Sequence, residues 1–492
     1  MFSKNTLLNF FIISFLISIL VNNYLQDFLL SFYVFLAFSL IYFNVSIYKK
    51  SIKKYILLFL MILIGNISGT LISTLHIENI RDNISFLEKQ FLRKYDYEFK
   101  VKDLYKKYDF YNTYIVQIYK IGETIVDKNI DGVVYLPSNL SLEKGQYIAT
   151  NSQIINVDNI DNNFDYKSYL LSKNIYFKSY LYNHKIIKEE KNILTTLSKY
   201  RKNILNVINK IYPKDEATFL SGILIGAREN IPKSLNESFN DSGTTHLVAV
   251  SGFNITILII FLGFFIKFMP IVFRTIAIVS FLVVFCLFVG LEASVIRAGI
   301  MGILGYFIMI SGRKNNSITI LLLTSFFMIL YNPYYINYDV SFQLSFLAVL
   351  GILYTKDYFY KIFSFLPNTL AIRDSFSITL SAMTLTLPIM MFNFGQVSLL
   401  APISNLLIVW NIPLIMIIGF LSIIGYYIYS ILGITIGLFA FVLLRWDLTV
   451  IKYFGNLDKF IIKFDFGDYA LYLEVLYFFI LGFIIILNKK RD

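Results

Sequence analysis

The sequence predicts a polytopic α-helical integral membrane protein with a small extracytoplasmic β-barrel domain inserted after the third transmembrane helix. Hydrophobic residues make up 57% of the 492 residues and charged residues only 15%, which is typical of membrane proteins. Many apolar runs approach the roughly 20 residues that a helix needs to cross a bilayer. One long polar segment, residues 78–192, interrupts these runs and contains short β-prone stretches.

The N-terminal domain, residues 1–77, is expected to hold about three transmembrane helices. Its apolar runs cover residues 6–22, 28–47 and 55–76. The first run lacks a small-x-small cleavage site and two more follow at once, so we interpret it as a retained helix rather than a signal peptide. Lysines between Lys49 and Lys54 place the loop after the second helix in the cytoplasm. The N-terminus is then cytoplasmic, and the chain after residue 77 lies outside.

The external segment, residues 78–192, is expected to fold as a small β-barrel. Its β-prone runs occupy residues 113–119, 132–136, 147–150 and 153–157, with turn signals between them. The five-stranded oligonucleotide-binding (OB-like) fold is one candidate for such a barrel. These folds bind single strands on aromatic platforms within basic grooves. The charges of acidic and basic residues nearly cancel in this segment, so the sequence does not indicate a basic groove. The alternative is that the abundant tyrosines and phenylalanines fill the barrel core.

The second half of the chain is expected to begin with amphipathic or interfacial helices over residues 193–240. The apolar stretch 217–227 is too short for a crossing, so we expect a helix that lies in the membrane surface or dips into it. Residues 241–492 are expected to form about nine transmembrane helices. Lysines and arginines in alternate loops and at the C-terminus place those loops and both termini in the cytoplasm of a multi-pass inner (plasma) membrane protein. The spans are 246–267, 275–291, 295–311, 317–331, 340–355, 376–394, 402–426, 431–447 and 470–488, and a re-entrant or interfacial course is an alternative for 340–355.

The sequence contains no recognisable pattern of catalytic, metal-binding or cofactor-binding residues. The net charge is +12, but much of the excess falls in predicted cytoplasmic loops, where topology explains it. The single cysteine, Cys286, excludes an intrachain disulfide, and three scattered histidines offer no metal set. No phosphate-binding loop is present. We therefore expect no cofactor, no metal and no enzymatic activity.

Polar residues instead cluster within and beside the apolar runs of the second half. Such groups cost free energy at bilayer depth unless they meet partners or a water-filled cavity, so they either line a path or bond helix to helix. For Arg297, a side chain that reaches to the lipid headgroups is a further alternative. The candidates for pore-lining or structural roles are His246, Ser251, Asn254, Ser294, Arg297, Asp339, Gln343, Ser345 and Asn405.

In order along the chain, these clusters resemble the ComEC/Rec2 family of competence proteins. Gly243-Thr-Thr-His246-Leu-Val-Ala-Val-Ser251-Gly252-Phe-Asn254 is similar to the family signature His-Leu-x-Ala-Val-Ser-Gly-x-His. Asn254 stands where that signature has a second histidine. Three further segments support the resemblance: Ala293-Ser294-Val-Ile-Arg297-Ala298, Asn332-Pro333 with Asp339-Val-Ser-Phe-Gln343-Leu-Ser345, and Ala401-Pro402-Ile-Ser404-Asn405.

The resemblance implies an inner-membrane channel that moves single-stranded DNA into the cytoplasm during natural transformation. It implies partners as well, namely a separate motor ATPase and DNA-receptor proteins, and it leaves a homodimer open. Many relatives continue into a metallo-β-lactamase-like domain. The sequence ends at Asp492 without the His/Asp cluster of that domain, so we expect a channel without its own nuclease, served by a separate nuclease protein.

Two alternatives belong to other functional classes. The first is a polytopic transporter or membrane enzyme for a small molecule or lipid, in which His246 and Asp339 act as an acid/base or proton-relay pair. The second is a structural membrane protein whose barrel recruits other proteins. Single-stranded DNA remains the favoured partner because neutral donors with one or two cations suit the passage of a long polyanion, whereas strong basic sites would trap it.

Overall fold

The computed structural model describes residues 4–31, 52–91, 93–108, 110–158, 165–229, 231–248, 250–311, 317–367, 372–464 and 477. The chain divides into two compact units, each described here by itself. The first comprises Met1–Glu190 with Ile308–Gln343, and the second comprises Lys191–Phe307 with Leu344–Asp492.

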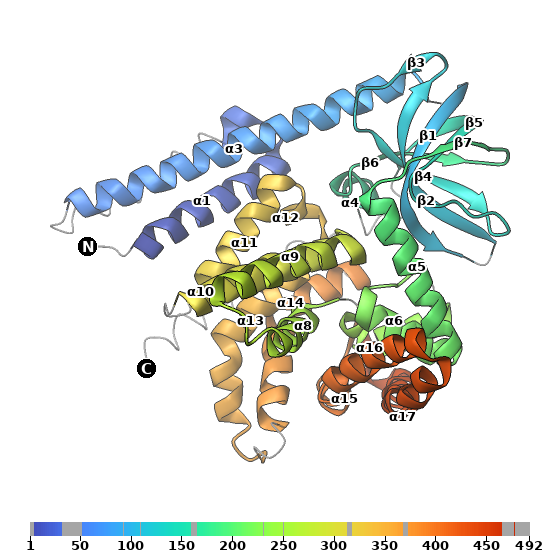
Figure 1. Cartoon of the computed structure of the whole chain (residues 1–492). Coiled ribbons are helices and arrows are strands. Elements are labelled where there is room, and N and C mark those ends of the chain that lie inside the picture. The colour runs from blue at the N-terminus through green and yellow to red at the C-terminus, as the bar shows by residue number, and fades with distance from the viewer. Residues whose placement is uncertain are drawn as a thin grey trace. The chain divides into compact units, whose positions relative to one another are not determined.

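The helices of the first unit pack through small residues. Helix α1 lies along α3 (Figure 1), where a Cβ at Gly65 would come within 2.1 Å of Ser14 Oγ and one at Gly69 within 2.0 Å of Ser18 Oγ. Small residues let apolar helices approach this closely. The predicted span 28–47 falls largely outside the described residues, and α3 runs past the predicted boundary at residue 77. These helices are α1 (Lys4–Leu25), α3 (Ile52–Glu88), α11 (Ser317–Tyr331) and α12 (Tyr335–Tyr338).

The first unit also contains a β domain whose strand pairing returns to its first strand. Strand β1 pairs with both β2 and β5, and the order of neighbours is β1-β2-β4-β6-β5-β7. All these pairs are antiparallel except β4 with β6, which is parallel. The strands are β1 (Lys94–Lys107), β2 (Tyr111–Ile121), β3 (Thr124–Ile125), β4 (Asp131–Pro137), β5 (Gln146–Asn156), β6 (Ile175–Tyr180) and β7 (Lys185–Glu189), and helix α4 (Tyr166–Ser172) precedes β6.

An aromatic stack fills the core of the β domain. The ring centroids of Tyr97 and Phe99 lie 5.4 Å apart, and those of Phe99 and Phe177 lie 5.7 Å apart. All three side chains are fully buried. Gly132 makes room for the stack, because a Cβ there would lie 2.3 Å from the Phe177 ring. Some of the aromatic residues thus do fill the core, as the alternative expectation held.

The second unit is helical apart from one short strand pair, and its core surrounds helix α6. Every residue from Glu216 to Ile225 is buried, and residues of α5, α16 and α17 join the same hydrophobic cluster. Other helices of the protein thus enclose α6 on all sides, and its expected place, in the membrane surface or dipping into it, stays a prediction. The N-terminal elements are α5 (Ile193–Ile211), α6 (Lys214–Ile225), α7 (Lys233–Asp241), η1 (Thr245–Leu247), α8 (Gly252–Phe265), α9 (Ile271–Val289) and α10 (Ala293–Ile310).

The remaining elements of the helical region complete the set of apolar helices. They are α13 (Val340–Ile362), α14 (Ile372–Phe394), β8 (Gln396–Ser398), α15 (Ala401–Ile408), α16 (Ile412–Ile428), α17 (Ser430–Gly455), η3 (Asp458–Phe460) and β9 (Ile461–Lys463). The described residues hold seven helices that are long and apolar enough to cross a membrane, or eight if α15 and α16, bent by 45°, form one span. The protein is thus a multi-pass membrane protein. About twelve spans were predicted; 470–488 lies almost wholly outside the described residues, and α11 has only 15 residues.

Candidate functional site

The first polar motif begins with a turn that docks onto helix α15. Ser404 Oγ donates a hydrogen bond to the Ser242 carbonyl at 2.8 Å, and the hydroxyls of Ser242 and Thr244 lie 2.7 Å apart. Gly243 has φ = 71°, and a Cβ there would come within 2.4 Å of Ala401 Cβ. Only glycine adopts this backbone conformation and leaves this space at little cost. The fold thus brings together two motifs that lie about 160 residues apart.

The same motif then holds α8 against the buried helix α6. Asn254 is 3% exposed and donates from Nδ2 to the Ile223 carbonyl at 3.1 Å, while Ser251 Oγ donates to Asn254 Oδ1 at 3.3 Å. Ile223 lies in the last turn of α6, where carbonyls lack helical donors. Asn254 therefore braces two helices. His246, in η1, is exposed.

Arg297 and Ser294 lie on the first two turns of α10, after the hairpin at Gly290. Both side chains are partly buried. The Nε atom of Arg297 is buried without a hydrogen-bond partner among the described residues. A charged group at this depth costs free energy unless water or a ligand reaches it. Arg297 is thus a cation with at least one donor, its Nε–H, that the described residues leave without an acceptor.

Two other predicted residues leave buried oxygen atoms without a hydrogen bond. Asn405 is 6% exposed, and its Oδ1 has no partner within the described part of the chain. The hydroxyl oxygen of Ser345 on α13 is also buried without a hydrogen-bond partner among the described residues. An unmet buried acceptor costs roughly 1–3 kcal/mol, so these positions are candidates for contact with water or a passing ligand.

Asp339 and Gln343 belong to the first unit and are fully engaged there. The Asp339 side chain has no exposed surface; its Oδ2 lies 2.8 Å from Lys173 Nζ, and its Oδ1 accepts from the Phe342 backbone N–H at 3.0 Å. Gln343 Nε2 donates to the carbonyls of Ile336 and Asn337 at 3.1 and 2.8 Å. These contacts cap α13 and fix the chain before it.

The neighbouring Asn332 ties this segment to the β domain a second time. Asn332 Nδ2 donates to the Ser172 carbonyl at 2.7 Å, one residue before Lys173. Asn23 of α1 donates to the Pro333 carbonyl at 2.9 Å. Residues 332–343, which we term the junction segment, therefore join α1, the end of α4 and α13. Their role in the fold is structural.

Some residues of these networks were not anticipated from the sequence. Lys173 and Asn23 gave no signal, because their partners lie 166 and more than 300 residues away. A further pair lies in the second unit, where Asn411 Nδ2 donates to Asp447 Oδ1 at 2.9 Å and both side chains are fully buried. The sequence pointed to Asn411, which follows the Asn405 motif beside Pro413, but not to Asp447. A lone acid inside the apolar run 431–447 was the signal that could have found Asp447. The described residues contain no group of three or more side chains able to hold a metal.

The comparisons with known proteins agree with the motifs. A profile of the family described as "Competence protein" matches residues 223–491. The chain is also 24% identical over 250 residues to "ComE operon protein 3" of Bacillus subtilis (strain 168), a match that covers 50% of this chain but only 31% of that relative's length. No solved structure matches the chain. Because the profile covers more than half of the sequence and includes the segments around Asn254, Arg297, Asp339 and Asn405, the chain belongs to the competence-protein (ComEC/ComE3) family.

Proposed function

We propose that this protein is a non-enzymatic conduit through which single-stranded DNA crosses the plasma membrane into the cytoplasm during competence. The observation that carries the proposal is the family match over residues 223–491, which includes most of the helices of the second unit. DNA is a polyanion, and a route through hydrocarbon must supply hydrated polar groups along its length. The proposal therefore needs polar atoms in these helices that make no hydrogen bond within the protein itself.

Three of the predicted residues, all in the second unit, meet that need. Arg297, Ser345 and Asn405 each keep a buried polar atom without a hydrogen bond in the described structure. One cation and two neutral groups suit weak, repeated contact with phosphates and bases, because a few strong basic sites would hold the strand in place. These residues line the route in our proposal, while Ser251 and Asn254 brace it. Asp339 and Gln343 are assigned to the junction segment rather than to the route.

The β domain faces outward in this proposal and has the OB-like fold. The support is the pairing order, which closes from β5 back to β1 and has one parallel pair, β4 with β6. The lysine-rich loop at residues 49–54 supports a cytoplasmic N-terminus and an external β domain. Directional movement is supplied by a separate motor ATPase, with receptor and nuclease proteins as further partners. A homodimer would be compatible with the same route.

The test follows fluorescently labelled external DNA in a strain that lacks the gene and carries a plasmid-borne copy. Without the protein, DNA reaches the cell envelope but not the cytoplasm. Arg297→Gln lowers cytoplasmic entry by at least about tenfold, the equivalent of about 1.4 kcal/mol, whereas Arg297→Lys retains most of it. Normal entry in the deletion strain would overturn the conduit. Normal entry with Arg297→Gln would overturn only the assignment of Arg297.

The transporter alternative has less support from the geometry. It required Asp339 as half of a proton-relay pair, but both oxygens of Asp339 are engaged, one by Lys173 and one by the Phe342 backbone. A structural role in the junction segment already accounts for both contacts of Asp339.

A further inference from the structure

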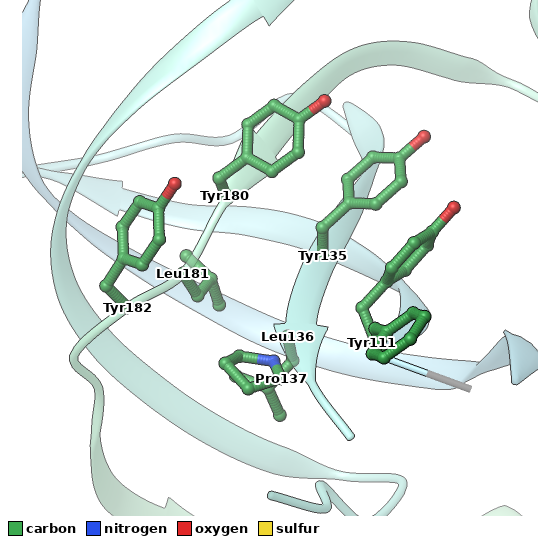
Figure 2. Close-up of a pocket in the computed structure, with 8 residues that line it drawn as sticks. Tyr111, Tyr135, Leu136, Pro137, Tyr180, Leu181 and Tyr182 are labelled. Carbon is green, nitrogen blue, oxygen red and sulfur yellow. The ribbon is translucent and has the colours of Figure 1, made fainter. Parts of the chain in front are cut away.

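A ladder of tyrosines crosses the outer face of the β domain. Tyr108 and Tyr111 stack with ring centroids 4.5 Å apart, Tyr111 and Tyr135 lie 5.5 Å apart, and Tyr135 and Tyr180 lie 4.8 Å apart. The last three come from the adjacent strands β2, β4 and β6, in which Tyr135 and Tyr180 are register partners. Figure 2 shows these rings side by side, with their hydroxyl groups pointing the same way.

The ladder borders a shallow cavity that two exposed aromatic rings flank. The cavity has a volume of about 260 Å³, and its walls include Phe110 and Tyr182, whose side chains are 86% and 80% exposed. Small-molecule pockets usually measure about 300–1,000 Å³ and enclose their ligand. A smaller, open site suits one unit of a polymer that continues on either side.

The charges around the ladder favour an anionic polymer. The eight residues that line the cavity are neither acidic nor basic, and the positive charge beside the ladder comes from Lys106, whose Nζ lies 5.0 Å from the centre of the Tyr108 ring. Burial, followed by the neighbouring tyrosine hydroxyls, raises the pKa of Tyr111 and Tyr135. A tyrosine hydroxyl is already neutral at physiological pH with its ordinary pKa of about 10, so these hydroxyls can donate hydrogen bonds there.

We propose that this surface, which we term the tyrosine platform, binds single-stranded nucleic acid by stacking its bases on the exposed rings of Phe110 and Tyr182, while the hydroxyls of the ladder donate hydrogen bonds to the strand. The inference rests on the proposed function and adds its external binding site. Aromatic faces accept any base, because every base has a π-face. A duplex offers no free base faces along its length, so the platform selects single strands and lets Lys106 meet the backbone.

The test uses the full chain in lipid nanodiscs and fluorescence anisotropy with three labelled probes of roughly 15 units, within the site size of an OB fold. They are oligo-dT, an abasic strand with the same backbone, and a duplex. The wild type binds oligo-dT more tightly than the abasic strand or the duplex. Phe110→Ala with Tyr182→Ala weakens oligo-dT binding by about fivefold to 100-fold, since each stacked base contributes about 1–3 kcal/mol, and leaves abasic binding unchanged. Both side chains are largely exposed, so the fold does not depend on them.

Tyr119→Ala provides the matched control. Tyr119 lies on the same strand and the same face as Tyr111, but it contacts Tyr147 and Lys188 instead of the ladder; this variant binds oligo-dT like the wild type. Equal binding of oligo-dT and abasic strand by the wild type would overturn the platform, as would an unchanged affinity of the double variant. A neutral chitin oligosaccharide that competed equally well would assign the surface to glycans instead. None of these outcomes touches the conduit, which is measured by DNA entry into the cytoplasm.

Discussion

The buried polar groups of the junction segment differ in their hydrogen bonding from two predicted residues in the helices of the second unit. In the junction segment, Asp339 binds a lysine and a backbone N–H, and Gln343 donates to two carbonyls. In the second unit, Arg297 and Asn405 each keep a buried atom without a hydrogen bond in the described residues. Both regions look alike in the sequence, as polar residues in or beside apolar runs. The difference separates groups that hold the fold together from groups left free for water or a ligand.

The largest expected effect comes from breaking the junction. Asp339→Ala removes the partner of Lys173 and the N-terminal cap of α13, so we expect the free energy of unfolding to fall by roughly 3 kcal/mol. Lys144→Ala is the matched control, because its 3.0 Å ion pair with Asp103 lies at the surface; it should lose at most about 1 kcal/mol. Denaturant titration in mixed micelles measures both. Equal losses would mean that the junction is no more structural than a surface ion pair.

An intermediate effect distinguishes a bonded asparagine from an unbonded one. Asn254→Ala leaves the Ile223 carbonyl without its donor and should cost about 1–2 kcal/mol. Asn405→Leu removes an unmet acceptor and should change stability by less than about 0.5 kcal/mol, yet it should lower DNA entry. Stability in micelles and cytoplasmic DNA entry are measured for both variants. A large loss of stability from Asn405→Leu would move this residue to the structural group.

The smallest effect concerns Asp131, a buried acid of β4 whose Oδ2 lies 2.8 Å from Lys102 Nζ. Burial raises the pKa of Asp131, and Lys102 offsets only part of that shift. The folded state therefore holds the proton more tightly than the unfolded state, whose pKa is about 3.9. Stability from this group is greatest below that pH and declines as the pH rises through the folded-state pKa. Unfolding measured across this range should show a weaker decline for Asp131→Asn; an identical pH dependence would contradict the assignment.

Much of the fold could be predicted from hydrophobicity alone. Apolar runs anticipated α1, α8, α9, α10 and α17, because bilayer thickness fixes the length of a crossing helix. Helix α6 marks the limit of this reasoning, because its apolar residues are buried within the protein and hydrophobicity alone could not show that. Runs of β-branched residues anticipated β2, β4 and β5, although β5 was read as two segments. Strands β1 and β6 were missed, although residues 95–102 of β1 alternate aromatic or apolar with charged side chains, which is the pattern of a strand with one buried face.

The candidate site was predictable as a set of residues but not as a set of contacts. The motifs identified Asn254, Arg297, Asp339 and Asn405, because a polar group in an apolar run is visible locally. Whether each group is satisfied depends on a distant partner. Ile223 lies 31 residues from Asn254, and Lys173 lies 166 residues from Asp339. The tyrosine platform is visible only when three strands pair, so composition alone could not separate it from the core.

The link between Lys173 and Asp339 also sets an order of events during synthesis. The lysine leaves the ribosome 166 residues before its partner, so at the roughly 5–20 residues per second of translation the β domain waits for several seconds or longer. During that interval the pairing of β1 with β5 can already close its sheet, but Tyr334, which belongs to the same core, has yet to be made. The segment from Asn332 to Gln343 would then complete the core of the β domain as it folds onto it.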